Sequence, residues 1–489
     1  MGSLLEPGRN CWRIEQAARA AVIIDACDYY RIIRQMMRKA TSRIMIIGWD
    51  FDPRIQLDRT ERDESLGDFL LALAKEKPNV DIRILKWDIG ALKLLFRGRA
   101  LGWLARLAWQ RSIRFTLDHA HPTGCSHHQK IVVIDDSFAI CGGIDMTGDR
   151  WDKPAHADQE PGRVRPNGKP YGPWHDVTMA VDAPLARALA ELARDRWHRA
   201  TGEQLPVLPQ RDDLWPDDLE PHFRGSRFGI ARTQAPYKEW PEVREVEALF
   251  LDAIASAKRF IYVENQYLTS PRIAAAIMRR MEEPDPPEIV LVTPITADGW
   301  LERVAMDATR LRLMKIIGAS DPQNRFRIFT PKTIGGQDIY VHAKVMIVDD
   351  RFLKIGSANM NNRSLGLDSE CDLALESSSD EERTTIAALR TRLMAEHVGA
   401  TEEQVAEAFE RTGSLLSTIA ELTREGVRRL EPLPYEKPEG AARFIAETEL
   451  LDPKSPDAMF EAMTRRTLFD PLRGRLRALR HRRRRKVPA

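Results

Sequence analysis

The chain has 489 residues, a length that ordinarily divides into two or more domains. Hydrophobic residues make up 43% of it, enough to bury sizeable cores, and the formal net charge is only +2. The five cysteines are scattered without metal-ligand spacing, and the N-terminus lacks the basic start and apolar core of a signal peptide. These features argue against a cysteine-bound metal centre and against export by that route, and they favour reduced thiols in a cytoplasmic protein.

The first half of the chain, residues 1–201, alternates apolar runs with helical periodicity. The runs predict strands over 43–48, 82–85, 131–134, 138–141 and 177–181, and the periodic segments predict helices over 26–40, 65–76 and 183–200. Charges recur too often in 91–111 for a membrane span. This segment fits either a basic amphipathic helix lying in a lipid interface or an ordinary helix packed on the domain.

Proline and glycine mark two irregular stretches. The first, 153–173, is expected either to roof a site or touch lipid, or to be a disordered surface insertion. The second, 202–240, is predicted to be a linker with little regular structure between the halves.

The second half, residues 241–400, repeats the order of the first. Strands are predicted over 260–263, 289–293, 345–348, 352–355 and 372–375, and helices over 243–257, 271–281, 299–316 and 381–398. The alternation predicts duplicated α/β/α layers with mixed sheets, two halves related by a pseudo-twofold axis.

Residues 401–489 are expected to form a helical extension and a basic tail. From 465 to 489 there are eleven arginines and lysines and one aspartate, a balance of +10. Such a tail can bind an anionic lipid surface or nucleic acid, or it can be solvated without a partner.

One unusual string occurs twice in the chain. It consists of a histidine, a lysine two residues later and an aspartate five residues after that, followed by a pair of small residues: His128, Lys130, Asp135 and Gly142-Gly143; then His342, Lys344, Asp349 and Gly356-Ser357. Two matches in one register indicate a duplicated fold that brings two histidines and two lysines to one site.

The chemistry that these residue types permit is narrow. Two imidazoles and two ammonium groups suit an anionic electrophile, and phosphate esters fit that description. One neutral histidine can attack phosphorus while the other, protonated, donates to the leaving oxygen, with a phosphohistidine between the two half-reactions. The lysines would stabilise charge on the phosphate oxygens, and neither a metal nor another cofactor is needed.

Strand alternation explains the spacing, because residues i and i+2 of a strand point to one face. Asp135 and Asp349 then come at the strand ends, where they are interpreted as residues that fix the turn in preference to a direct chemical role. Small residues, Gly143 and Ser357 among them, would let the backbone approach a phosphate, and Asn359 is placed to donate to it.

The paired strings resemble the phospholipase D superfamily. Flanking segments extend the resemblance over roughly residues 20 to 400: Trp174-His-Asp176, Tyr262-Val-Glu-Asn-Gln-Tyr267, Tyr340, Asn359 to Glu370, and Glu396-His-Val-Gly399. These flanks are similar to the phosphatidylcholine-cleaving enzymes more than to the short nucleases of the superfamily.

The resemblance implies a role for each matching residue. The catalytic set would be the two strings: His128, Lys130, Asp135, His342, Lys344 and Asp349. Phosphate would be bound by the lysines and Asn359, helped by Ser357 and Gly143, and the histidines would be oriented by Asp152 and Glu370. Glu264, Asn265 and Tyr267 would line the substrate pocket, whereas His175 is interpreted as structural.

Two details depend on the comparison between the halves. Relatives usually use the more N-terminal histidine as nucleophile, which favours His128, although the sequence treats the two almost symmetrically. The position equivalent to Asn359 is Asp145 in the first half. A carboxylate there would repel phosphate, so Asp145 is expected to point away or to support a neighbour.

The resemblance predicts a phospholipase D that hydrolyses a glycerophospholipid, phosphatidylcholine being favoured, to phosphatidic acid and a free head-group alcohol, with transfer to alcohols as a second outcome. A cardiolipin-synthase-like phosphatidyltransferase is the alternative. A nuclease is less favoured, because the short nucleases carry one motif per chain, and a silent lipid-binding scaffold is disfavoured by two intact motifs. The expected partner is a phospholipid membrane surface, and nucleic acid is disfavoured. The protein is expected to be a monomer. Its expected location is the cytoplasm or a membrane surface, and the alternative is secretion without a recognisable signal peptide.

Overall fold

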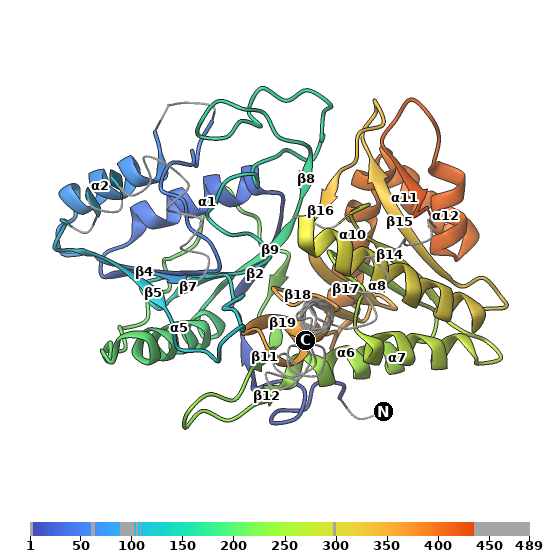
Figure 1. Cartoon of the computed structure of the whole chain (residues 1–489), viewed down its shortest axis with the longest axis horizontal. Helices are drawn as coiled ribbons and strands as arrows, with labels where there is room; N and C mark the ends of the chain where they lie inside the picture. Colours follow the sequence, from blue (N-terminus) through green and yellow to red (C-terminus); the bar gives the residue numbers. More distant parts are fainter. Residues whose placement is uncertain are drawn as a thin grey trace, which may run out of the picture.

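The computed structural model describes residues 3–59, 64–88, 102–103, 106–107, 109–296 and 300–434. Most of the segment 91–111 and the whole basic tail therefore lie outside the described residues. Within the described part, strands form two large mixed sheets, one in each half, and the halves stand side by side (Figure 1). None of the described helices is long and apolar enough to cross a membrane.

The N-terminal sheet has the strand order β10-β2-β9-β7-β6-β3-β4-β5. Its strands are β2 (Arg19–Ile24), β3 (Arg43–Gly48), β4 (Asp81–Trp87), β5 (Ile113–Asp118), β6 (Ile131–Ile134), β7 (Phe138–Gly142), β9 (Val177–Asp182) and β10 (Phe223–Arg224). The pairs β3–β4 and β4–β5 are parallel, and the other pairs are antiparallel.

The C-terminal sheet has the order β1-β11-β19-β18-β17-β13-β14-β15-β20, with β12 beside β11. Its strands are β1 (Arg13–Gln16), β11 (Arg227–Gln234), β12 (Val243–Arg244), β13 (Phe260–Asn265), β14 (Glu288–Val292), β15 (Phe326–Lys332), β17 (Lys344–Val348), β18 (Phe352–Gly356), β19 (Glu370–Glu376) and β20 (Arg429–Pro432). Here too the parallel pairs are adjacent, β13–β14 and β14–β15. The series β2-β9-β7-β6-β3-β4-β5 thus matches β11-β19-β18-β17-β13-β14-β15 in order and direction, which confirms the duplicated fold.

Helices cover both faces of each sheet. They are α1 (Ala26–Lys39), α2 (Leu66–Glu76) and α5 (Leu185–Thr201) in the first half, and α6 (Glu245–Ser256), α7 (Pro271–Met281), α8 (Trp300–Ala319), α9 (Asn362–Gly366), α10 (Asp380–Val398), α11 (Glu402–Thr412) and α12 (Leu415–Leu422) in the second. In Figure 1 α1 and α2 lie above the first sheet, whereas α6 and α7 lie below the second, as a twofold axis along the view would place them.

Local sequence explains where these helices start and stop. Ser270 accepts a hydrogen bond from the Ile273 amide and is followed by a proline at the first turn of α7, and Ser379 caps α10 in the same way at Glu382. Helix α10 ends at Gly399, whose φ of 65° is a left-handed conformation that glycine adopts without strain.

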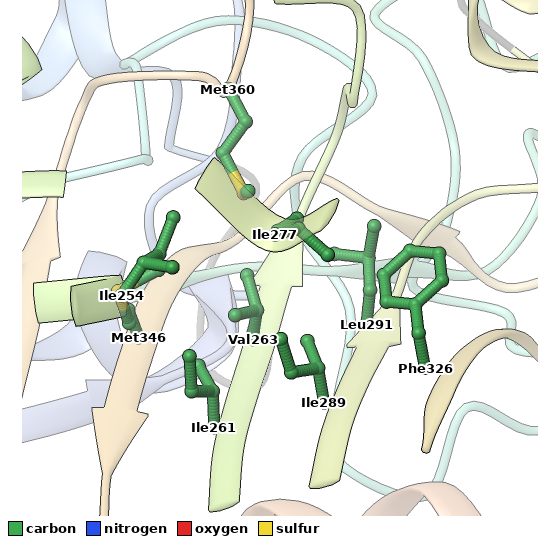
Figure 2. A pocket seen from close by; sticks show the side chains of 9 residues that line it. All are labelled: Ile254, Ile261, Val263, Ile277, Ile289, Leu291, Phe326, Met346 and Met360. Atoms are coloured by element: carbon green, nitrogen blue, oxygen red, sulfur yellow. The ribbon is translucent and has the colours of Figure 1, made fainter. Parts of the chain in front are cut away.

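A shared core joins the two halves. The largest hydrophobic cluster takes side chains from both sheets and from α5 and α10, among them Val133, Trp197, Ile347 and Leu389. Separate clusters fill the space under α1 and α2 and under α6 and α7. Figure 2 shows an apolar void in the last of these, lined by side chains such as Ile261, Val263 and Met346. At about 10 Å³ it is a packing defect too small for a ligand.

The stretch 202–240 differs from the prediction of little regular structure. Its second part forms β11, a strand inside the C-terminal sheet paired with β19, and Phe223–Arg224 form β10 in the other sheet. Most of the prolines in this stretch precede β10, so their density over the whole stretch concealed the strand. The predicted domain boundaries stay predictions, although β1 from the first half pairs with β11 and so crosses between them.

The loop 153–173 is ordered and attached to the second half. Asp158 accepts hydrogen bonds from the Thr333 hydroxyl and the Gly335 amide, the latter at 2.8 Å. Arg428 donates to the Ala155 carbonyl at 2.9 Å. Of the two expectations for this loop, the disordered insertion is wrong, because these contacts hold it between the halves.

Candidate active site

A cavity of about 460 Å³ lies at the junction of the two halves. His128 and His342 both line it, together with side chains from each half: Trp49, Asp50, Trp87, Asp145, Arg150, Trp174, Gln266, Tyr267, Asn359, Arg363, Ser364 and Asp368. The structure therefore brings together the two histidines that the sequence predicts to share a site. The size of the cavity is in the range of pockets that bind small ligands.

His128 is held by residues of the second half. Its amide donates to the Ser369 carbonyl at 2.9 Å, and its Nδ1 lies 3.0 Å from both carboxylate oxygens of Glu370. Glu370 also accepts hydrogen bonds from the hydroxyls of Ser357, at 2.5 Å, and Ser364, at 2.6 Å. With the proton on Nδ1 directed to this carboxylate, Nε2 of His128 is the nitrogen available to a ligand in the cavity.

His342 is held by the first half in the same way. Its amide donates to the His175 carbonyl at 2.8 Å, and its Nδ1 lies 2.7 Å from Oδ2 of Asp176. The short strands β8 (Trp174–His175) and β16 (Tyr340–Val341) pair in parallel just before these residues and join the halves at the site. Nε2 of His342 is thereby left for the cavity as well.

The two orienting carboxylates occupy equivalent positions in the duplicated fold. Gly142 pairs with Thr178, two residues after Asp176, and Gly356 pairs with Asp372, two residues after Glu370. Asp176 directly precedes β9 and Glu370 begins β19, the strand next to the glycine strand in each half, yet each carboxylate contacts the histidine of the other half. The prediction that Glu370 orients a histidine agrees with this geometry, but the histidine is the one in the first motif.

The prediction for Asp152 is wrong. Asp152 lies away from both motif histidines and bonds His156 Nδ1 at 2.9 Å, the Arg163 guanidinium at 3.1 Å and the Trp174 amide at 2.9 Å. Asp152 was predicted because it is an acidic residue beyond the first motif, but the loop 153–173, inserted in the first half only, separates the orienting carboxylate from that motif. The segment Trp174-His-Asp176, already noted as similar to the superfamily, held the missed carboxylate.

Gly143 and Ser357, predicted to admit a phosphate, instead accommodate the orienting carboxylates. A Cβ atom on Gly143 would lie 2.0 Å from Oδ1 of Asp176, so only glycine fits there. Ser357 is fully buried and donates to Glu370, as described above. Both residues support the histidine–carboxylate pairs, and this contact explains their small size.

The lysines lie beneath the cavity surface. Nζ of Lys130 donates to the His128 carbonyl at 2.8 Å and lies 3.4 Å from Oδ2 of Asp145, while Nζ of Lys344 donates to the His342 carbonyl at 2.5 Å. Asp145 thus supports a neighbour, as expected, and it also lines the cavity.

Lys130 of the first half contacts the carboxylate of Asp145, whereas Lys344 of the second half contacts the side-chain amide of Gln266. Lys344 donates to Oε1 of Gln266 at 3.3 Å, and Asn359 donates to the same oxygen at 3.4 Å. The side-chain oxygen of the buried Asn359 has no hydrogen-bond partner among the described residues. Asn359 therefore remains a candidate phosphate ligand, and the two subsites are unequal.

Asp135 and Asp349 lie at the far ends of their strands, as turn residues. Asp349 accepts hydrogen bonds from the amides of Lys258, Arg259 and Phe260, where β13 begins. Asp135 does the same at the start of β3. A five-residue strand spans about 16 Å, which removes Asp349 from the chemistry at Lys344. These contacts favour the structural interpretation of both aspartates.

Of the three predicted pocket residues, only Tyr267 lines the cavity. Asn265 is buried and bonds the Tyr267 and Met360 amides, at 3.2 and 3.0 Å, so it shapes a loop beside the site. Glu264 is fully buried and accepts hydrogen bonds from His175 at 2.8 Å and His397 at 2.9 Å. Glu264 and Asn265 are therefore not pocket residues, because the strand they end carries them inside the sheet. Gln266, between them and Tyr267, was missed although it lies in the same segment.

Burial and the two lysines control protonation at the site. Burial, with Lys130 and Lys344 adding to it, lowers the pKa of His128 well below its usual value. Burial and the same lysines also lower the pKa of His342. Burial, reinforced by Lys130, lowers the pKa of Lys344 to about 7. Burial raises the pKa of Glu370. In the free site the two histidines therefore favour the neutral form and Lys344 titrates near pH 7, and an entering anion would favour the protonated forms of these three groups.

Aromatic rings form much of the cavity wall. Trp49 and Trp87 stack with ring centroids 5.7 Å apart, and Trp174 stacks on Tyr340 at 4.5 Å. A second cavity of about 270 Å³ adjoins the first at Trp174 and is walled by the loop 153–173 through residues that include Tyr171. The site therefore offers two neighbouring compartments to one ligand.

Comparison with known proteins agrees with this geometry. The family model for phospholipase D matches residues 324–427. The chain is 26% identical over 421 residues to phospholipase D A of Dictyostelium discoideum, a match that covers 72% of this chain and 32% of that protein. It is 25% identical over 509 residues to phospholipase D alpha 1 of Ricinus communis, covering 74% of this chain and 62% of that protein. The chain thus spans about a third of the length of the first relative and less than two thirds of the length of the second.

The fold also resembles that of solved structures. The crystal structure of phosphatidylserine synthase from Haemophilus influenzae Rd KW20 aligns with a TM-score of 0.55 and 12% identity, covering 85% of this chain and 98% of that one. Fold and site together define a duplicated α/β protein with two crossed histidine–carboxylate pairs at the junction of its halves. The matched segment and these relatives support the resemblance of the chain to the phospholipase D superfamily.

Proposed function

We propose that the protein is a phosphodiesterase of the phospholipase D type, which hydrolyses a glycerophospholipid to phosphatidic acid and a free head-group alcohol. The single observation that carries the proposal is the pairing of both motif histidines with carboxylates on Nδ1, at 3.0 Å for His128 and 2.7 Å for His342, in one cavity. This arrangement presents two Nε2 atoms to one substrate, as a double displacement at phosphorus requires. The named relatives are phospholipases D.

In the proposed reaction, Nε2 of His128 attacks phosphorus and the bond from phosphorus to the head-group oxygen breaks. His342 gives its Nε2 proton to that oxygen, and the head group leaves as an alcohol. Water then attacks the phosphohistidine, the phosphorus–nitrogen bond breaks, and His342 takes the proton of the water. An alcohol in place of water gives the transfer product.

Substrate binding would favour uptake from solvent of the proton that His342 donates in this scheme. The pKa of His342 is lowered in the free site by burial and by Lys344, so the free histidine is neutral. A phosphate diester brings a negative charge that offsets the lysines and raises the pKa of both histidines. Glu370 and Asp176 then stabilise whichever imidazole carries the second proton.

Phosphatidylcholine is the proposed substrate. Trp49, Trp87 and Tyr267 line the cavity and offer aromatic rings, which attract quaternary ammonium groups. A cardiolipin-synthase-like phosphatidyltransferase would share the first half-reaction and differ only in the acceptor. We further propose that the monomer works at a phospholipid surface, which the exposed Trp109 supports.

The test uses the purified full chain with phosphatidylcholine vesicles and a primary alcohol, with EDTA and no added metal. We expect release of choline together with phosphatidic acid and phosphatidyl-alcohol, because one phosphohistidine divides between two acceptors. Absence of choline release, with phosphatidylglycerol converted to cardiolipin in a parallel reaction, would favour the transferase.

Both histidines are required in this mechanism. His128→Ala and His342→Ala should each lower kcat by about a thousand-fold or more while the fold survives. Thr147→Ser, on the same cavity wall, is the matched control and should keep kcat within a few-fold. Appreciable turnover in either histidine variant would rule out the double displacement.

A further inference from the structure

A second group of titratable side chains lies buried behind the His342 pair. It comprises Asp25 before α1, Asp152 and His156 at the loop 153–173, His175 of β8, Glu264 of β13 and Glu396 of α10. Asp25, His156 and His175 have exposures of 0 or 1%, and Glu396 is 7% exposed. The group therefore gathers segments from both halves at a buried place.

Four donor atoms of this group converge. Nε2 of His156 lies 3.0 Å from Oε1 of Glu396 and 3.5 Å from Oδ2 of Asp25. Nδ1 of His175 lies 2.7 Å from the same Glu396 oxygen and 3.3 Å from Oδ1 of Asp25. The donor atoms of these four residues all lie within 4.8 Å of one another. Four ligands bound at 2.0–2.1 Å in a tetrahedron would be separated by about 3.3 Å, close to the four nitrogen–oxygen distances of 2.7, 3.0, 3.3 and 3.5 Å.

The outer nitrogens of both histidines are also bound to carboxylates. Nδ1 of His156 lies 2.9 Å from Asp152, and Nε2 of His175 lies 2.8 Å from Glu264. If each outer nitrogen donates its proton there, each inner nitrogen carries a lone pair directed at the centre of the group. Metal-binding histidines are held in this way by a second carboxylate.

Two atoms of the group, Oδ2 of Asp25 and Nδ1 of His175, lie close to the atoms named above but make no hydrogen bond of acceptable geometry with any described residue. Unpaired polar atoms of this kind are costly in a buried place. The charges are also unbalanced: within the described part of the chain, the four carboxylates of Asp25, Asp152, Glu264 and Glu396 have one arginine as an ion-pair partner, Arg163, which bonds Asp152. With neutral histidines the group lacks positive charge.

We propose that Asp25, His156, His175 and Glu396 bind a divalent transition metal, Zn²⁺ by the chemistry of its donors. Two imidazole nitrogens and two carboxylate oxygens suit this ion, and four protein donors in a closed, buried arrangement define a structural site. The metal would join α1, the loop 153–173, β8 and α10. It would fix His175 and, through it, the adjacent Asp176 that orients His342. The site is separate from the cavity and does not depend on the proposed reaction.

Metal content of the full chain tests the proposal. The protein, purified without an affinity metal and passed rapidly through EDTA, should carry about one zinc per chain by inductively coupled plasma mass spectrometry. His156→Gln and Glu396→Gln should each lower the content at least about tenfold, because each removes a donor. His121→Gln, a histidine outside the group, is the control and should keep the metal.

A second measurement covers variants that fail to fold. The wild-type chain, unfolded and refolded with CoCl₂, should show the visible absorption of tetrahedral cobalt. Its midpoint of thermal unfolding should rise by about 5 °C or more over protein refolded in EDTA. Wild-type protein without zinc, without the cobalt spectrum and with the same midpoint in EDTA would overturn the proposal. The two histidines would then be imidazolium ions that balance the carboxylates.

Discussion

Glu370 accepts hydrogen bonds from three side chains, His128 Nδ1 and the hydroxyls of Ser357 and Ser364. Three donors fix the carboxylate in one orientation, which in turn fixes the ring of His128 and the nitrogen that carries the proton. The serine at position 357 is explained by its contact with the Glu370 carboxylate, and its hydroxyl also accepts a hydrogen bond from the Cys371 amide at 3.0 Å.

Glu370→Gln tests this orientation. An amide can present its NH₂ group to Nδ1 and favour the wrong tautomer, so we expect kcat to fall by about a hundred- to ten-thousand-fold with little change in KM. The measurement is steady-state choline release. Glu376→Gln, at the other end of β19, is the control and should leave kcat unchanged. A KM effect without a kcat effect would contradict the orienting role.

Lys344 predicts a pH dependence of anion binding. Its pKa is lowered to about 7, chiefly by burial, so the free side chain loses its proton as pH rises through 7. Because a bound anion favours the charged amine, binding takes up a proton above pH 7, and affinity should fall by up to about tenfold per pH unit there and level off below it.

Sulfate is the suitable probe, because its charge is constant over this range. Calorimetric titrations in two buffers of different ionisation enthalpy, from pH 6 to 9, would report both affinity and proton uptake. Lys344→Met should bind sulfate weakly and without this slope. Equal affinity of the wild-type protein at pH 7 and pH 9 would refute the assignment.

At the scale of the elements, the buried strands and long helices were predictable. The apolar runs of β3, β6 and β17 and the periodicity of α7 and α10 are strong local signals, and each element was found within a few residues of its prediction. The edge strand β1 and the two-residue strands β8 and β16 were not predicted from the sequence, because their pairing depends on partners far along the chain.

The site was predictable to the extent that it lies in contiguous strings. His128, Lys130, His342, Lys344 and Asn359 were identified by spacing, and the structure brings both histidines and Asn359 to one cavity. Asp176 was missed and Asp152 was chosen because the loop 153–173 lengthens the sequence between the first motif and the carboxylate of that half. Glu264 was misjudged because a sequence cannot say which side of a strand end faces a cavity.

The turns that Asp135 and Asp349 fix can be tested separately from catalysis. Asp349→Ala leaves three amides of the β13 start without their acceptor, and we expect a loss of about 1–3 kcal/mol in the free energy of unfolding. Urea unfolding measures the loss, and kcat per folded molecule should stay within a few-fold. The exposed Asp285→Ala is the control. A large fall in kcat with an unchanged free energy of unfolding would indicate a chemical role for Asp349.

At the scale of the whole molecule, neither half holds a complete site. Each histidine depends on a carboxylate of the other half, and the largest core cluster draws on both sheets. The strand β1 also pairs with β11 across the predicted boundary.

A split chain tests this dependence. Fragments 1–209 and 210–489, divided between the exposed residues Pro209 and Gln210, should each be inactive when expressed alone and should recover activity when co-expressed. Choline release and gel filtration of the co-purified fragments are the measurements. Turnover by either isolated fragment would show that one motif suffices.

The crossed pairing also bears on how such a chain can change over time. A symmetric homodimer of either half would form the same two pairs, each histidine meeting the carboxylate of the second copy. In a homodimer every substitution occurs twice, so both subsites must change together. Fusion into one chain removes that restraint and permits differences such as those between Asp145 and Asn359 and between Asp176 and Glu370. In the proposed reaction, one side of the phosphate can then specialise for the leaving group while the other specialises for the acceptor.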